Sequence, residues 1–139
     1  MPKTILIGAP IDCGQKRAGC LMGPAAYRVA GIAHEVSAEG HGVEDWGDLT
    51  LPELRDVTCP NPVVHDLPET VGWAEILMDR VDDALSEGGF PIIMGGDHSL
   101  ALGSAAGAAA FAARQGRPLF LLWLDAHSDF HTPLTTTSG

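Results

Sequence analysis

Short β-rich runs alternate along this chain with longer segments of helical periodicity. The runs are ILIGAP (5–10), VEDWG (43–47), FPIIMG (90–95) and PLFLLWLDAH (118–127), and expected helices lie between them at about 23–39, 69–87 and 99–116. Such alternation is typical of successive βαβ units. We therefore expect an α/β fold in which a parallel sheet is flanked by helices on both faces.

Two of the expected helices differ in how they should pack. In 69–87 the apolar residues recur at spacings of three and four, which predicts one face packed on a sheet. They are Val71, Ala74, Leu77, Met78, Val81, Ala84 and Leu85. Positions 101–113 are rich in Ala and Gly, so this thin helix should approach the sheet closely. The Pro-rich segment 49–69 lacks a period and reads as a long loop.

Composition excludes several classes of protein. A hydrophobic content of 45% with 19% charged residues is what a globular core requires. The chain has 8 Lys and Arg against 18 Asp and Glu, so a nucleic-acid partner is not expected. The first apolar run is too short for a signal peptide or a membrane span, and we expect a cytoplasmic protein without membrane contact. Cys13, Cys20 and Cys59 lack zinc or redox spacing and read as reduced thiols.

The clearest site pattern follows the last apolar run. Asp125, His127, Asp129 and His131 occupy every second position after LFLLWL. In an extended chain alternate side chains share one side, so these four should point the same way. The apolar run itself reads as a central strand buried on both faces. Ligands of open α/β sheets bind just beyond the carboxyl ends of strands, where these residues would lie.

A second strand end should contribute to the same rim of the sheet. Gly95 and Gly96 permit a tight turn after FPIIMG, Asp97 is a plausible helix N-cap, and His98 would be left at the sheet edge. Imidazoles and carboxylates without thiolates suit Mn, Fe(II), Co or Zn, and ligand type alone does not choose among them. Two such ions would support hydrolytic chemistry by lowering the pKa of a bound water.

Other polar residues carry less information. The isolated histidines His34, His41 and His65 are expected to be structural or solvated. The glycine-punctuated stretch at Asp12, Cys13 and Gly14 indicates only a loop.

The two strand-end motifs together resemble a known family. GGDHS followed by DAHSD is similar to the paired signature of the ureohydrolases, the manganese enzymes that include arginase, agmatinase and formimidoylglutamase. IGAPIDCGQKRAGCLMGPAAYR, VEDWGDL and PLTTTSG narrow the resemblance to arginase, and it extends from residue 5 to residue 139.

The resemblance implies a site for two Mn²⁺ ions. His98, Asp125 and Asp129 would bind one ion, while His127 and the bridging Asp125 would bind the other. Asp129 would be catalytic, because it would accept a hydrogen bond from the metal-bridging hydroxide that attacks the guanidinium carbon of L-arginine. The products would be L-ornithine and urea, which would place the enzyme in arginine metabolism.

The resemblance also implies residues that bind the substrate. They are His127, Asp129, His131, Thr136, Ser138 and Gly139. Thr136 and Ser138 match the stretch that recognises the α-carboxylate and α-amino groups of the amino acid. His131 stands where arginases commonly have Asn, which leaves agmatine or another guanidino compound as an alternative substrate.

Members of this family are longer than 139 residues, so we expect residues 1–139 to be the amino-terminal part of a single, truncated ureohydrolase domain. The part alone should be inactive, since family members carry further metal ligands, an acid/base His and a guanidinium-binding Glu beyond it. The alternative to an enzyme is a non-catalytic remnant that binds metal. The resemblance implies a homo-oligomer, a trimer or a hexamer, at full length.

Overall fold

One parallel sheet organises the chain. The computed structural model describes residues 3–15 and 18–137. The strands are β1 (Thr4–Ala9), β2 (Val43–Asp48) and β3 (Phe90–Gly95), in the order β2-β1-β3. β1 lies in the centre and pairs in parallel with both neighbours, with Thr4 opposite Val43 on one side and Phe90 on the other. The expected parallel α/β architecture is confirmed.

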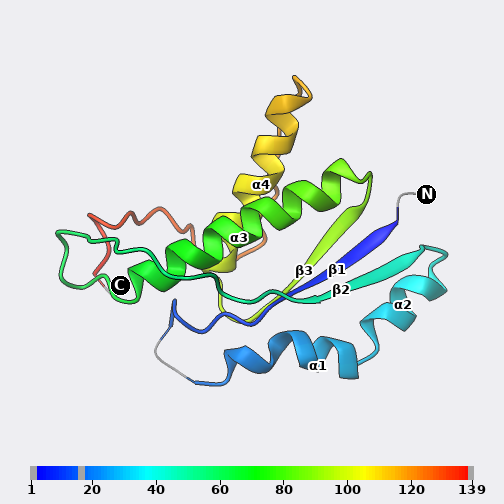
Figure 1. Cartoon of the computed structure of the whole chain (residues 1–139), viewed down its shortest axis with the longest axis horizontal. Coiled ribbons are helices and arrows are strands. Elements are labelled where there is room, and N and C mark those ends of the chain that lie inside the picture. Colours follow the sequence, from blue (N-terminus) through cyan, green and yellow to red (C-terminus); the bar gives the residue numbers. More distant parts are fainter. Residues whose placement is uncertain (1–2, 16–17, 138–139) are drawn as a thin grey trace.

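Both faces of the sheet are covered by helices (Figure 1). Ile5, Ile7 and Ala9 of β1 are fully buried in a cluster with Trp73 and Leu77 of α3 (Leu67–Ser86). The opposite face lies against α1 (Gly23–Val29): a Cβ on Gly8 would stand 3.1 Å from the guanidinium of Arg28. β1 is therefore buried on both sides, as its apolar sequence predicts.

The first helical segment is broken where a single helix at 23–39 was expected. After a 3-10 turn (Cys20–Met22), α1 ends at Val29 and α2 (Ile32–Ala38) begins two residues after Ala30. Gly31 between them has φ 89°, a left-handed conformation that glycine adopts without steric strain and that ends a helix. α3 lies close to its expected bounds.

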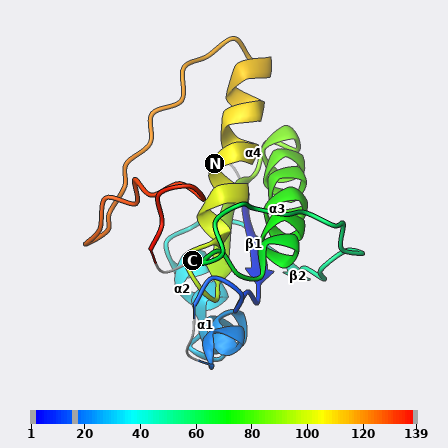
Figure 2. The same cartoon turned by 90° about the vertical axis from the view of Figure 1, so that its left-hand side faces the viewer.

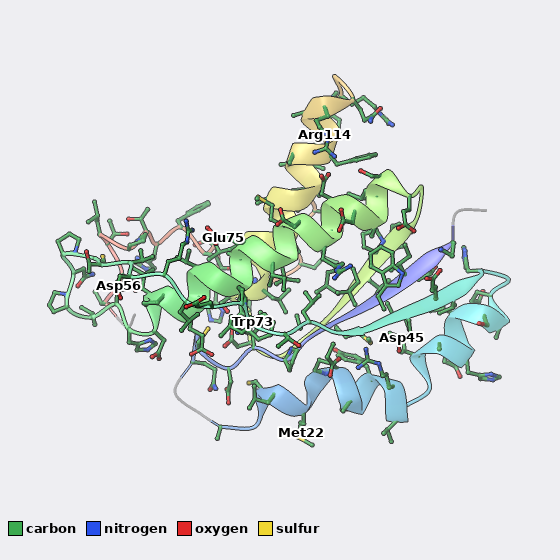
Figure 3. All side chains as sticks on the ribbon, viewed as in Figure 1. Met22, Asp45, Asp56, Trp73, Glu75 and Arg114 are labelled. Carbon is green, nitrogen blue, oxygen red and sulfur yellow. The ribbon has the colours of Figure 1, made fainter. Side chains whose placement is uncertain are left out.

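α4 (Leu100–Arg114) packs closely on α3, whereas the sequence suggested close approach to the sheet. A Cβ on Gly103 would stand 2.4 Å from the carbonyl oxygen of Ala74, and one on Gly107 would stand 2.5 Å from that of Met78. From this contact α4 extends away from the sheet to Arg114 (Figure 3). Within the described residues no helix is both long and apolar enough to cross a membrane.

The strand expected at 118–125 does not form. Residues 117–125 have no regular structure, and the chain after α4 arches away from the helices (Figure 2). Phe120, Leu122 and Leu124 are 90%, 80% and 86% exposed. A central strand needs a partner at its edge and apolar cover on both faces. No strand of the described chain pairs with this run. Helix α4, which packs on α3, does not cover it either.

Candidate metal centre

β3 delivers His98 to the carboxyl edge of the sheet. The strand ends at Gly95, and residues 96–99 form a turn before α4 begins at Leu100. Gly96 is required there, because a Cβ at this position would stand 1.9 Å from the carbonyl oxygen of Ile11. The side chain of His98 remains 51% exposed beyond the end of the strand.

Three of the four predicted metal ligands come together at this edge. One ligand atom from each of His98, Asp125 and Asp129 lies within 4.8 Å of the other two. Nδ1 of His98 is 3.6 Å from Oδ2 of Asp125 and 3.7 Å from Oδ2 of Asp129. An imidazole nitrogen and two carboxylates suit a divalent ion such as Mn²⁺, Fe²⁺, Co²⁺ or Zn²⁺. The residues at this position therefore fit a divalent metal.

The chain reaches this arrangement through a bend, and the predicted extended alternation is wrong. Residues 126 and 127 form a bend, and Asp129 has φ 52°, a left-handed conformation that Asp tolerates better than most residues. The bend aims Asp125 and Asp129 at His98. It leaves the side chain of His127 84% exposed and outside the three-residue group, with its Nδ1 3.3 Å from Oδ1 of Asp125.

A neighbouring donor favours the ionised form of Asp125. The backbone N–H of His127 donates to Oδ1 of Asp125 at 2.8 Å and holds the pKa of Asp125 below its usual range. Partial burial opposes this shift, and the imidazoles of His98 and His127 support it. The indole Nε1 of Trp123 donates to Oδ2 of Asp129 at 2.8 Å. A carboxylate must be ionised to bind a metal, so the lowered pKa of Asp125 favours a metal site.

A cavity of about 620 Å³ is lined by two of the three converging ligands, His98 and Asp129. His131 and Thr136 also line it, so two further predicted substrate-binding residues share this cavity with the two metal ligands. The predicted residues Ser138 and Gly139 lie outside the described residues. Another hollow of about 610 Å³, formed by residues of β2 and α3, contains none of the predicted site residues.

Two residues contribute to this region in ways that the sequence did not indicate. His65, interpreted as structural or solvated, lines the cavity. Asp97 does not cap α4, whose N-cap residue is Ser99. Its buried carboxylate instead accepts hydrogen bonds from Ser99 and from the backbone of Gly14. The Asp-x-Ser spacing could have suggested the bond between Asp97 and Ser99. No local signal in the sequence indicates the bond between Asp97 and Gly14.

Comparison with known proteins assigns the family. A sequence profile described as "Arginase family" matches residues 2–139. The chain belongs to the arginase family. Arginase from Brucella melitensis is 46% identical over 134 residues, which are 96% of this chain and 44% of that protein. Human mitochondrial arginase-2 is 43% identical over 136 residues, covering 96% of this chain and 37% of the relative. The chain thus spans less than half the length of these relatives.

Solved arginases have the same fold. The structure of Bacillus cereus arginase superimposes with a TM-score of 0.84 and 34% identity, over 100% of this chain and 44% of that one. Entamoeba histolytica arginase in complex with L-ornithine gives a TM-score of 0.80 at 27% identity, covering 100% of this chain and 47% of its own. The parallel sheet with its helices is therefore an arginase-family fold.

Proposed function

We propose that this chain forms part of a manganese-dependent arginase that hydrolyses L-arginine to L-ornithine and urea. The observation that supports this most strongly is the convergence of His98, Asp125 and Asp129, whose ligand atoms lie within 4.8 Å of one another. These residues come from two separate segments of the chain and meet at the carboxyl edge of a parallel sheet, where α/β proteins bind ligands.

Each residue of the centre has a proposed role. His98, Asp125 and Asp129 would hold one Mn²⁺, and His127 would join Asp125 in holding a second after rotating from its exposed position. Bound manganese would lower the pKa of water enough to supply hydroxide near neutral pH. Asp129 would orient the attacking oxygen by accepting its hydrogen bond, and it already accepts one from Trp123.

The adjoining cavity supports an amino-acid substrate. His131 and Thr136, which line this cavity as Asp129 does, could donate hydrogen bonds to a carboxylate. L-arginine offers an α-carboxylate that agmatine lacks. The Entamoeba histolytica relative was solved with L-ornithine, an amino acid of this class. In the proposed complex Ser138 and Gly139 would complete the same recognition stretch, and His127 and Asp129 would contact the substrate from the metal side.

We propose further that residues 1–139 are the amino-terminal part of a single ureohydrolase domain. The curated relatives support this, since this chain covers 44% and 37% of two of them. The complete enzyme would work as a homo-oligomer, a trimer or a hexamer, in the cytoplasm. Residues 1–139 alone would be inactive, because the acid/base His and the guanidinium-binding Glu that the resemblance implies are not among them. The loss of one positioned acid or base already lowers the rate by a factor of about 10² to 10⁴.

Urea release by the complete gene product tests the proposal. The purified protein loaded with Mn²⁺ should release urea from L-arginine and much less from agmatine. Asp129→Ala should abolish release, whereas Asp56→Ala, at an exposed loop position, should leave it unchanged. Preference for agmatine would point to another ureohydrolase, and bound Mn²⁺ without urea from either compound would point to a non-catalytic metal-binding protein.

A further inference from the structure

The turn that carries His98 is docked on the loop that follows β1. The backbone N–H of Gly96 donates to the carbonyl of Ala9 at 3.1 Å, and that of Asp97 donates to the carbonyl of Ile11 at 3.0 Å. The close approach at Gly96 leaves no room for a Cβ. The position of the turn is therefore set by a segment more than 80 residues earlier in the chain.

The carboxylate of Asp97 adds side-chain bonds to this docking. Oδ2 accepts the backbone N–H of Gly14 at 2.7 Å. Oδ1 accepts the backbone N–H of Ser99 at 2.9 Å and its hydroxyl at 2.5 Å. Asp97 is only 8% exposed, and all three of these bonds are partly buried. One carboxylate thus fixes the residue that follows His98 and ties the turn to Gly14.

The loop after β1 is itself firmly anchored. Ile11 is fully buried, and Cys13 is 5% exposed with its Sγ 3.4 Å from the hydroxyl oxygen of Thr70 in α3. His98, in contrast, is half-exposed, and its ring contacts Asp125, Asp129 and Trp123 on the far side of the centre. The Asp97 carboxylate therefore links the anchored loop after β1 to the turn that carries an exposed ligand.

We propose that Asp97 is a positioning residue for the metal ligand His98, and that it acts through its hydrogen bonds to Gly14 and Ser99. This inference rests on the proposed manganese site. Groups that orient a metal ligand without touching the metal typically contribute a factor of about 10 to 100 in metal affinity. Asp97 itself lies in the turn beside the ligand and needs no contact with the ion.

Asp97→Asn tests the role with the smallest change of shape. The amide can keep its oxygen on Ser99, but its NH₂ group then faces the N–H of Gly14, and two donors cannot bond to each other. Titration calorimetry on the complete gene product should show Mn²⁺ binding weakened about tenfold or more. The measurement is made well below the unfolding temperature, so the affinity of the folded protein is what is compared. Asp56→Asn, in an exposed loop, is the matched control and should bind as the unmodified protein does.

A change at Gly14 provides an independent route to the same contact. A Cβ there would stand 2.8 Å from Oδ1 of Asp97 and 3.0 Å from Cβ of Ser99, so Gly14→Ala should displace the carboxylate and weaken Mn²⁺ binding as well. Gly42→Ala is its control, since a Cβ at Gly42 meets nothing within 4 Å. If Asp97→Asn does not fold, Gly14→Ala decides the question.

The outcomes separate this inference from the proposed function. A lower unfolding temperature with unchanged Mn²⁺ affinity in the variants would give Asp97 a merely structural role and overturn the inference alone. Weakened affinity in either Asp97→Asn or Gly14→Ala, with both controls unchanged, would support it. Failure of the unmodified protein to bind Mn²⁺ would overturn the proposed function and this inference together.

Discussion

The indole N–H of Trp123 donates a hydrogen bond to Oδ2 of Asp129 at 2.8 Å. The same carboxylate oxygen lies 3.7 Å from Nδ1 of His98, and the rings of His98 and Trp123 have centroids 5.2 Å apart with planes inclined by 44°. Trp123 therefore contacts two of the three converging ligands. Any ion that draws these ligands together must change the surroundings of its indole.

Trp123 should report metal binding by its fluorescence. Adding Mn²⁺ to the complete gene product is expected to change tryptophan emission in a saturable way, because the Asp129 carboxylate and the His98 ring both move toward the ion. Trp123→Phe should remove most of this change, and Trp46→Phe, in β2 away from the centre, should keep it. A metal-dependent signal that survives in Trp123→Phe and disappears in Trp46→Phe would contradict the prediction.

The packing of α4 on α3 should depend on Gly107. Gly107→Ala adds a Cβ that would stand 2.5 Å from the carbonyl oxygen of Met78, and overpacking of this kind typically costs about 1–3 kcal/mol. The gain in helix propensity, up to about 1 kcal/mol, should not offset it. Urea unfolding should show a net loss of stability. Ala109→Ser, at an exposed position of the same helix, should change stability by less than about 0.5 kcal/mol.

The three thiols should differ in reactivity. Burial raises the pKa of Cys13, and although the hydroxyl of Thr70 opposes this shift, the thiolate remains disfavoured. Cys20 and Cys59 are free and partly exposed. Iodoacetamide should therefore alkylate Cys13 last, as followed by mass spectrometry of peptides from the native protein. Equal labelling rates in the native protein would contradict this, and equal rates after denaturation are the expected control.

Much of the fold could be predicted because its signals are local. Apolar runs located β1 and β3, and the three-and-four spacing located α3, which packs Trp73 and Leu77 on the sheet. The break at Gly31 and the missing strand at 118–125 could not be predicted. A left-handed glycine is only one of the conformations open to that residue, and a strand exists only where a neighbour pairs with it.

The candidate site shows the same division. The motif positions correctly suggested that His98 should lie close to Asp125 and Asp129. The reason, that strand ends gather at one edge of a sheet, was only half right, because His98 follows strand β3 whereas no strand of the described chain leads directly into Asp125. The exposed orientation of His127 could not be predicted, since it depends on a bend at residues 126 and 127. The bond between Asp97 and Gly14 joins residues 83 positions apart, and neither residue type indicates it.

The ion pairs of Arg28 should make stability depend on pH in the acid range. Nε of Arg28 lies 2.7 Å from Oδ2 of Asp45, and this hydrogen bond is the main reason that the pKa of Asp45 is held below its usual value of 3.8. Above 3.8 the carboxylate is ionised whether the chain is folded or unfolded, and the stabilisation is fully present. It is lost as the pH falls through the lower pKa of the folded state.

Urea unfolding of Asp45→Asn tests this dependence. Because both side chains are partly exposed, the pair of Arg28 and Asp45 should contribute only about 0.2–1 kcal/mol to the free energy of unfolding at neutral pH. The difference between Asp45→Asn and the unmodified protein should shrink as the pH is taken well below 3.8. A difference that grows on acidification would contradict the assignment of Asp45 as the stabilising partner.

The apolar run at 119–124 should drive self-association of residues 1–139. All six side chains are exposed, from 39% at Trp123 to 90% at Phe120, and contiguous exposed apolar surface of this kind marks an interaction site or an aggregation liability. In the described chain β3 is an edge strand of the sheet. Its outer backbone N–H and C=O groups are therefore also open to pairing with another chain.

Charge placed in this run should therefore suppress association. Leu122→Lys combined with Leu124→Lys is expected to raise the monomer fraction of residues 1–139 in sedimentation velocity and to lower binding of an apolar dye, because lysine is one of the residues that protect exposed edges from pairing. Val29→Lys is the matched control: Val29 is 90% exposed on α1 but isolated from the run, so its replacement should change neither measurement. Sharp, cooperative unfolding of an unsubstituted monomer that binds no dye would show that the run is covered in solution.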